Sequence, residues 1–401
     1  MADGANVVAL GQRLEAEVAA FRADLPLGVE VTQSSDQADI VTHAFDEFIM
    51  TFSQAFPAEL VLETLKALAQ ALHFDFQNDK QLFQVSARIG VVLNSDQALG
   101  IEKLYYCATL AARELRMSHD QGIQIFDEEI NSRYLRSRNL LSDLKQAIAG
   151  KFPGLSLHYQ PQIHLKNGQR LGCEALMRWH HPEQGLLSPA QFVAVAEETR
   201  LILELGDWVL NEACRQLRAW ADAGLSLPPV AVNLSARQVD ERLPERLEKV
   251  LNRHNVLPSQ LKLEITESLV MRNPEMVLPV LNQLVAMGLS IALDDFGTGY
   301  SSLGYLKRLP LSRLKIDKSF VAGVPGSPEG EAIIRASLSM AHDLGLDVVA
   351  EGVETDDQRD FLLSHGCDRL QGYLIARPMA AEAFAQWWRE HQHGQVLSPT
   401  P

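Results

Sequence analysis

The feature that most constrains the fold is the regular alternation of short apolar runs with helical patterns between residues 155 and 375. A buried strand of a parallel sheet reads as a continuous apolar run, and parallel strands need long, usually helical, crossovers between them. The predicted strands are Leu157–Ile163, Leu171–Arg178, Val230–Leu234, Leu261–Ile265, Leu289–Leu293, Arg313–Ile316, Asp347–Ala350 and Arg369–Ile375. The predicted helices include Pro189–Thr199, Leu203–Ala223, Pro274–Met287, Gly330–Leu344 and Asp356–Ser364. Eight strands in about 250 residues predict an α/β fold, a (β/α)₈ TIM-like barrel, in preference to an open doubly wound sheet, whose glycine-rich phosphate-binding turn is missing after the first strand.

Polar residues stand at the ends of most predicted strands: Glu174, Asn233, Glu264, Asp294 with Asp295, Lys315, Glu351 and Gln371. In a barrel the carboxyl ends of the strands converge on one rim, so residues far apart in the sequence meet there. Each residue alone has an ordinary explanation, such as a cap, an Asx turn or a snorkelling lysine. Together, five carboxylates would repel one another without cations, and hard oxygen ligands favour Mg²⁺ or Mn²⁺ over zinc. A rim rich enough in acids for two such ions, with a lysine beside it, suits hydrolysis of a phosphate ester.

The densest part of this pattern is residues 290–303, where an apolar run ends in Asp294 and Asp295 and a Gly297-Thr298-Gly299 loop follows. Two carboxylates at the end of a buried strand are unfavourable unless a cation neutralises them. The glycines allow the loop to bend tightly or its backbone to approach a ligand. The stretch predicts a metal site with a movable loop above it; the alternative is a solvated acidic turn followed by a flexible loop.

Composition and charge limit what the 401-residue chain can bind. Its formal net charge of −15 argues against binding to a nucleic-acid polymer but leaves room for a small phosphate ligand. The four cysteines form no C-x-x-C pair, so we expect reduced thiols and a cytoplasmic protein. The N-terminus lacks the regions of a signal peptide, and no run of about 18 apolar residues predicts a membrane segment. A larger membrane-anchored or sensor protein, of which this chain is the cytoplasmic part, stays open.

The first 127 residues predict a smaller α+β domain. Helices are predicted over residues 6–22, Ala58–Leu72 and Gly100–Leu115, and strands over Asp39–Phe52 and Phe83–Leu93. A charged helical pattern then covers Asp127–Ala149 and ends at Gly150 and Pro153-Gly154. We therefore divide the chain into a first domain of residues 1–127, a connecting helix of residues 128–151, the barrel of residues 152–392 and a tail of residues 393–401.

An ordered set of motifs in residues 152–390 resembles the EAL-domain cyclic di-GMP phosphodiesterases. The set is Glu174-Ala175-Leu176 with Arg178, Asn233-Leu234-Ser235, Glu264-Ile265-Thr266-Glu267, the stretch from Asp294 to Leu303, Lys315-Ile316-Asp317, Glu351-Gly352-Val353-Glu354 and Gln371-Gly372-Tyr373. The resemblance implies hydrolysis of one phosphodiester of cyclic di-GMP to give linear pGpG, and a homodimer formed through the barrel. The alternative is a non-catalytic cyclic di-GMP receptor; members of that type typically lose acidic ligands or the loop motif, and this chain keeps them.

The resemblance also implies two Mg²⁺ or Mn²⁺ ions that activate a water by lowering its pKa. The residues implied to hold them are Glu174, Asn233, Glu264, Asp294, Asp295 and Glu351. Asp294 would bridge both ions, and Lys315 would position the water and offset developing negative charge. Glu174, Lys315 and Glu351 are the implied catalytic residues.

Further residues follow from the same resemblance. Arg178 would grip a ligand phosphate through its guanidinium fork, Gln371 would hydrogen-bond near the metal waters, and Leu176 would line the substrate site. Glu267 and Glu354 are the implied tethers of the Gly-x-Gly loop, and Asp317 is a further site residue. Ser312 departs from the family's Leu-Pro-x-Asp pattern, which puts a local loop or interface contact in doubt rather than the chemistry.

The first domain resembles the second half of a GGDEF (diguanylate cyclase) domain. The similar stretches are Thr42-His43-Ala44-Phe45-Asp46-Glu47-Phe48, Val85-Ser86-Ala87-Arg88-Ile89-Gly90 and Gly122-Ile123-Gln124-Ile125-Phe126-Asp127. Ala44 and Phe45 replace the two glycines that let backbone approach the GTP phosphates. The family's first strand is missing, and its inhibitory Arg-x-x-Asp would fall near Ser35 and Ala38. We therefore expect a degenerate, truncated GGDEF domain that regulates or dimerises and is not a cyclase.

Overall fold

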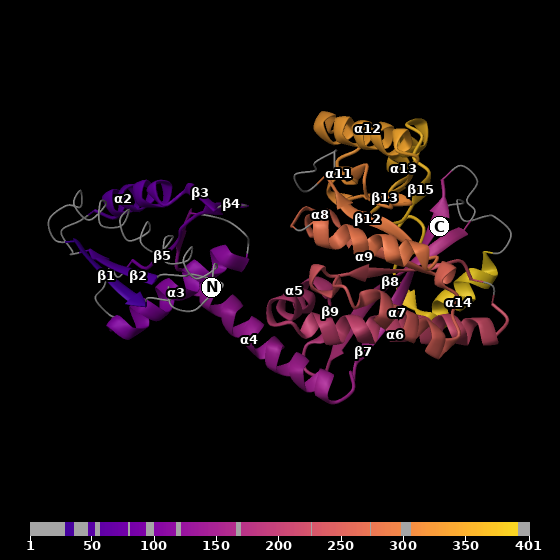
Figure 1. The fold of residues 1–401 in the computed structure, drawn as a ribbon, viewed down its shortest axis with the longest axis horizontal. Coiled ribbons are helices and arrows are strands. Elements are labelled where there is room, and N and C mark those ends of the chain that lie inside the picture. The colour runs from indigo at the N-terminus through magenta and orange to yellow at the C-terminus, as the bar shows by residue number, and fades with distance from the viewer. Residues whose placement is uncertain are drawn as a thin grey trace. The chain divides into compact units, whose positions relative to one another are not determined.

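The computed structural model describes residues 29–35, 47–52, 57–78, 81–93, 100–117, 122–165, 170–225, 227–272, 274–297 and 306–391 (Figure 1). The chain forms two compact units, Met1–Asn139 and Leu140–Pro401. Four predicted features lie outside the described residues: the helix over residues 6–22, the Thr42–Asp46 motif, most of the glycine loop and the tail of residues 393–401. Within the described ranges, no helix is both long enough and apolar enough to cross a membrane.

The N-terminal unit is an α+β arrangement of short strand pairs and helices. Its elements are β1 (Val29–Ser35), β2 (Glu47–Phe52), α2 (Ala58–Ala71), β3 (Phe74–Asn78), β4 (Gln81–Val85), β5 (Arg88–Val91), α3 (Ile101–Met117) and β6 (Gly122–Ile125). The predicted strand Phe83–Leu93 is wrong as a single element, because β4 pairs with β3 whereas β5 pairs with β6. Gly90 permits close packing of α3 on β5, since a Cβ there would lie 1.9 Å from the Ala108 carbonyl oxygen.

Helix α4 (Glu128–Ala149) begins at Asp127, whose side chain accepts a hydrogen bond from the Ile130 N–H at 2.7 Å. The boundary between the two units falls inside this helix. Its second half packs Leu140, Leu144 and Ala147 into an apolar cluster that also holds Trp179, Phe192, Val195 and Leu205. The same half carries Asp143, whose carboxylate lies 3.1 Å from Nε2 of the buried His181. The end of α4 is thus an integral part of the C-terminal unit.

The C-terminal unit is a closed barrel of eight strands (Figure 1). The strands are β7 (Leu155–His164), β8 (Arg170–His181), β10 (Val230–Leu234), β11 (Leu261–Thr266), β12 (Ser290–Phe296), β13 (Arg313–Ile316), β14 (Asp347–Ala350) and β15 (Arg369–Leu370), paired in this order with β15 returning to β7. The pairs β8–β10, β10–β11, β11–β12, β12–β13, β13–β14 and β14–β15 are parallel, as predicted. Strand β7 departs from a regular (β/α)₈ barrel, because it is antiparallel to both β8 and β15.

Helices cover the outside of the barrel and pack their apolar faces on it (Figure 1). They are α5 (Pro189–Thr199), α6 (Leu201–Asp222), α7 (Leu243–His254), α8 (Glu267–Arg272), α9 (Pro274–Ala286), α11 (Lys318–Val321), α12 (Pro328–Asp343), α13 (Asp356–Ser364) and α14 (Ala381–Glu390). Two short strands, β9 (Gly185–Leu187) and β16 (Met379–Ala380), add to the sheet at its edges. The core between barrel and helices includes an aromatic group of Tyr159, Trp220 and Phe384, with ring centroids 4.7 to 5.9 Å apart.

The predicted strand Arg369–Ile375 ends early, after Leu370. Beyond it the chain turns against the segment that follows β14: the Val353 N–H donates to the Gln371 carbonyl at 3.2 Å and the Leu374 N–H to the Val353 carbonyl at 3.0 Å. Gly372 makes this approach possible, because a Cβ there would lie 2.0 Å from the Val353 carbonyl oxygen. The early end of β15 places Gln371 at the rim.

Candidate active site

The structure brings residues from seven successive strands to one end of the barrel. They are Glu174 on β8, Asn233 on β10, Glu264 on β11, Asp294 and Asp295 on β12, Lys315 on β13, Glu351 directly after β14 and Gln371 directly after β15. The parallel register pairs Asn233 with Glu264 and Asp294 with Thr266. Carboxylate oxygens of Glu174, Glu264 and Asp294 lie within 4.8 Å of one another, and all three residues are buried.

Lys315 lies at the centre of this carboxylate cluster and is only 1% exposed. Its Nζ is 2.5 Å from Glu264 Oε2, 2.6 Å from Glu351 Oε1, 3.1 Å from Asp294 Oδ2 and 3.4 Å from Glu174 Oε2. Burial lowers the pKa of Lys315, but these four carboxylates outweigh it and hold the pKa well above its ordinary value. The ammonium is therefore charged at any physiological pH and is shared among four carboxyl groups.

The remaining negative charge is spread unevenly over the acids. Burial raises the pKa of Glu264 well above its ordinary value, against the attraction of Lys315. Burial likewise raises the pKa of Glu351 to about 8, with help from Asp294 and Glu174 and against Lys315. Burial also favours a raised pKa in Glu174, yet Lys315 and hydrogen bonds from neighbouring amides outweigh it and lower the pKa. The cluster therefore holds more carboxylate than its own cation can balance.

Side-chain amides fix the orientation of Glu174. Asn233 Nδ2 donates to Glu174 Oε1 at 2.6 Å, and Gln371 Nε2 donates to Glu174 Oε2 at 2.6 Å. Two glutamines of β7, which sequence reasoning missed, hold Gln371: it donates to Gln160 Oε1 at 3.1 Å and accepts from Gln162 Nε2 at 2.8 Å. The signal for these two was present, since they are polar residues two apart in the predicted strand Leu157–Ile163.

Asp295 reaches the rim through an irregular backbone. Successive side chains of a strand point to opposite faces, so a regular strand would turn Asp295 away from Asp294. The pairing of β12 with β13 instead shifts register between Leu293 and Phe296, and Asp295 has a φ of 53°, in the left-handed region. Burial and the charge of Asp294 raise the pKa of Asp295 to about 6. This bulge could not be read from the two adjacent aspartates.

The donor set fits a hard divalent cation. It consists of buried carboxylate oxygens and one amide, with no cysteine or histidine among the rim residues, which favours Mg²⁺ or Mn²⁺ over zinc. Glu264 Oε1 is buried and has no hydrogen-bond partner among the described residues, so this oxygen is free to bind an ion. A dication would also balance the charge that Lys315 leaves uncompensated.

The residues predicted to act on the loop divide into two cases. Glu267 is buried at the start of α8, and its Oε2 accepts a hydrogen bond from the Gly297 N–H at 3.2 Å, at the beginning of the loop; its tether role stays a prediction. Glu354 has an exposed side chain, and its backbone N–H donates to Gln358 Oε1. Because residues 298–305 lie outside the described ranges, the tether role of Glu354 stays a prediction.

The residues predicted to contact substrate lie on β8 and near the rim. Arg178 is half-buried, and its Nη1 donates to the Met177 carbonyl at 2.7 Å. Leu176 is half-buried two residues earlier. Asp317 caps α11 by accepting from the Ser319 N–H at 2.9 Å, which gives it a structural role beside the one predicted.

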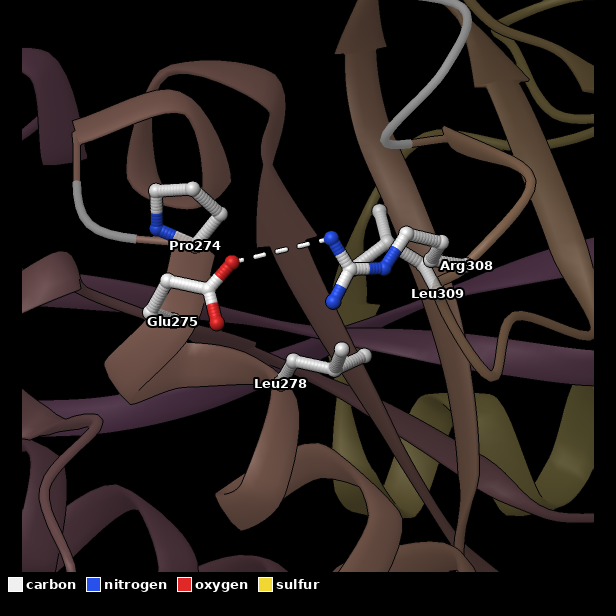
Figure 2. A pocket seen from close by; sticks show the side chains of 5 residues that line it. All are labelled: Pro274, Glu275, Leu278, Arg308 and Leu309. Carbon is white, nitrogen blue, oxygen red and sulfur yellow. Dashed lines mark ion pairs between the residues drawn. The ribbon is translucent and has the colours of Figure 1, made fainter.

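A pocket elsewhere on the barrel has none of this chemistry. Figure 2 shows Pro274, Glu275 and Leu278 of α9 facing Arg308 and Leu309. Its single carboxylate, Glu275, is paired with Arg308 at 3.6 Å. Of these two places in the described part of the barrel, the carboxylate rim has the groups able to perform catalysis.

Comparisons with known proteins place the chain among relatives named for cyclic di-GMP chemistry. The bifunctional diguanylate cyclase/cyclic di-GMP phosphodiesterase MucR of Pseudomonas aeruginosa is 42% identical over 338 residues, which are 84% of this chain and 49% of MucR. The cyclic di-GMP phosphodiesterase PdeR of Escherichia coli K12 is 34% identical over 347 residues, 86% of this chain and 52% of PdeR. The chain thus spans about half the length of these relatives.

Solved structures agree with the sequence relatives. A structure of the PaMucR phosphodiesterase in complex with c-di-GMP is 49% identical with a TM-score of 0.59, covering 61% of this chain and 99% of that one. A structure of the EAL enzyme Bd1971 with cAMP and cyclic di-GMP bound is 30% identical with a TM-score of 0.61, covering 73% of this chain and 77% of that one. Residues 141–378, more than half of the chain, match the EAL domain family, and the chain therefore belongs to that family.

Proposed function

We propose that the chain hydrolyses one phosphodiester of cyclic di-GMP to give linear pGpG. The observation that carries this proposal is the buried lysine among four carboxylates at the rim of an EAL-family barrel. Relatives of the same family are named as cyclic di-GMP phosphodiesterases, and one solved relative holds c-di-GMP. A non-catalytic receptor would not need so many uncompensated acids, which oppose the approach of an anionic ligand.

The residues that would hold two Mg²⁺ or Mn²⁺ ions are Glu174, Asn233, Glu264, Asp294, Asp295 and Glu351. When bound, such ions supply Lewis acidity and lower the pKa of a water so that it can act as a nucleophile at neutral pH. We assign the ions to this group because the carboxylates of Glu174, Glu264 and Asp294 are buried and close together, and because Glu264 Oε1 has no hydrogen-bond partner among the described residues.

Other residues of the chain would stabilise charge, orient the metal ligands and bind the substrate phosphate. Lys315 keeps its proton and places a fixed positive charge where negative charge develops on the phosphate. Gln160, Gln162 and Gln371 hold Glu174 in one orientation, so the ligand oxygens need little rearrangement. Arg178 presents a guanidinium from the same strand for a phosphate of the ligand.

The N-terminal unit would regulate the barrel and not synthesise cyclic di-GMP. Ala44 and Phe45 carry side chains where a cyclase needs bare backbone against GTP, which supports this assignment. We also propose that the chain acts in the cytoplasm and as a homodimer through the barrel.

The test is turnover by the purified full chain with Mg²⁺ or Mn²⁺, followed by chromatographic separation of cyclic di-GMP and pGpG. We expect pGpG to form and Glu174→Ala to abolish it. Glu245→Ala is the matched control, because Glu245 is an exposed glutamate of α7 paired with Lys249. Binding of cyclic di-GMP without turnover in the presence of both metals would refute the phosphodiesterase and establish the receptor.

A further inference from the structure

Three basic residues lie in the barrel one layer beneath the carboxylate rim. Lys262, Arg313 and Arg369 each stand two positions before a rim residue: Glu264 on β11, Lys315 on β13 and Gln371 after β15. Residues two apart on a strand point to the same face, so these side chains also face the barrel interior. At about 3.3 Å per residue, they lie about 7 Å below the rim. We call these three residues the basic layer.

Arg313 is the most buried member of the basic layer, at 5% exposed. Its Nη2 lies 3.9 Å from Asp347 Oδ2, while Nε and Nη1 are buried with no hydrogen-bond partner among the described residues. Asp347 is also bound by Arg369 through Nη2, so one carboxylate serves two guanidiniums. Burial, and then the charge of Arg369, lower the pKa of Arg313 to about 10, which leaves it charged at neutral pH.

The positive charge of the basic layer faces an excess of carboxyl groups at the rim. At the rim, four carboxylates face the single ammonium of Lys315. In the basic layer, Arg313 and Arg369 share the carboxylate of Asp347, and Asp368 also attracts Arg313. Buried charges without partners are costly, so two such layers stabilise each other across the barrel interior. Glu264 attracts both Lys262 and Arg313, but burial lowers the pKa of Lys262 to about 7, so Lys262 adds only part of a charge at neutral pH, while Arg313 stays charged.

We propose that the basic layer is a counter-charge for the metal site. Arg313 and Arg369, with Lys262, stabilise the rim carboxylates while no metal is bound and weaken the binding of a dication when it arrives. These residues contact neither metal nor substrate and act only through the effect of their charge on the rim. The proposal rests on the metal site proposed above.

The direction in which metal affinity changes when Arg313 is removed distinguishes this role from a structural one. If Arg313 only filled space, its loss would loosen the rim and weaken metal binding. If Arg313 repels the dication, its loss strengthens metal binding and at the same time destabilises the metal-free protein. A unit charge about 7 Å from a dication, at an effective dielectric constant near 20, repels it strongly enough to change the metal dissociation constant by about fivefold or more after solvent screening.

The experiment titrates the metal-free full chain with Mn²⁺ by calorimetry, without substrate, and records thermal unfolding in EDTA and in saturating Mn²⁺. We expect Arg313→Met to bind Mn²⁺ at least about fivefold more tightly than wild type and to unfold at a lower temperature in EDTA. Arg313→Lys keeps the charge and should bind Mn²⁺ as wild type does. Arg335→Met is the matched control, since Arg335 is an exposed arginine of α12 paired with Glu331.

Unchanged or weaker Mn²⁺ binding in Arg313→Met overturns the proposal. Arg369→Met gives the same test if Arg313→Met does not fold, because Arg369 is less buried, with 16% of its side chain exposed. The outcome is independent of the proposed function: a chain that binds Mn²⁺ but never cleaves cyclic di-GMP would refute the phosphodiesterase and still decide the role of Arg313.

Discussion

Replacing Lys315 by methionine removes the ammonium from the centre of the rim while keeping the length of the side chain. In wild type, four carboxylate oxygens lie between 2.5 and 3.4 Å from Nζ. The variant leaves these acids without their cation in a buried site. The folded-state pKa of Lys315 lies above the ordinary value for lysine. The ammonium therefore contributes its full stabilisation at neutral pH, and this contribution is lost only as pH rises through the folded-state pKa.

The size of the effect follows from the burial of both partners. Removing one member of a buried ion pair costs about 3 to 5 kcal/mol, because the other charge stays buried without compensation. The four contacts share one ammonium, so their contributions are not additive and we expect a total near this range. Raised pKa values at Glu264 and Glu351 let the rim take up protons, so the loss should be smaller at acidic pH.

The assay is denaturant unfolding of wild type and Lys315→Met, each in EDTA and in saturating Mg²⁺ or Mn²⁺. In EDTA we expect the variant to lose about 3 to 5 kcal/mol, and with metal to recover at least half, since a dication replaces the missing positive charge. Turnover should stay lost even in the metal-stabilised variant. A variant that matches wild type in EDTA, or whose loss is as large with metal as without, would refute the electrostatic account of the rim.

Three further predictions follow from single contacts. Glu351→Gln should gain stability relative to metal-free wild type as pH rises from about 4.5 to 8. In wild type the folded Glu351 carboxyl stays protonated up to about 8, whereas the unfolded one ionises near its ordinary pKa, so wild type loses stability over this range. Thermal unfolding in EDTA that gives parallel pH profiles for the two proteins would contradict this. Gly372→Ala should destabilise the barrel by about 1 to 3 kcal/mol, since its Cβ meets the Val353 carbonyl oxygen, whereas Gly100→Ala meets nothing within 4 Å and should be neutral in chemical denaturation. Glu267→Ala should lower kcat for cyclic di-GMP with an unchanged unfolding midpoint for the metal-bound protein, because it frees the glycine loop; unchanged turnover would remove the tether role.

Much of the barrel could be read from the sequence because its signals are local. The strands Val230–Leu234, Arg313–Ile316 and Asp347–Ala350 have the predicted bounds, because apolar residues stand at strand spacing in each of them. The helices Pro189–Thr199 and Asp356–Ser364 also have the predicted bounds, because Ser188 and Thr355 are N-cap residues that mark where they begin.

The features that sequence reasoning missed depend on contacts between distant segments. The direction of β7 is set by its pairing with β8 and β15, and an apolar run carries no sign of direction. The left-handed backbone of Asp295 arises from the register shift against β13, which two adjacent aspartates do not reveal. At the rim, the residue types and their convergence could be predicted, whereas the position of Lys315 among four carboxylates depends on side-chain packing across the barrel.

The reversed direction of β7 decides at which end the chain enters the barrel. In a barrel of parallel strands the first strand starts at the end remote from the catalytic residues. Here β7 starts at Leu155, opposite Trp179 and therefore beyond Glu174 on β8. Only residues 150–154 separate this point from the end of α4. A rotation of α4 would thus be transmitted through these five residues to the rim of the barrel, without passing through the core.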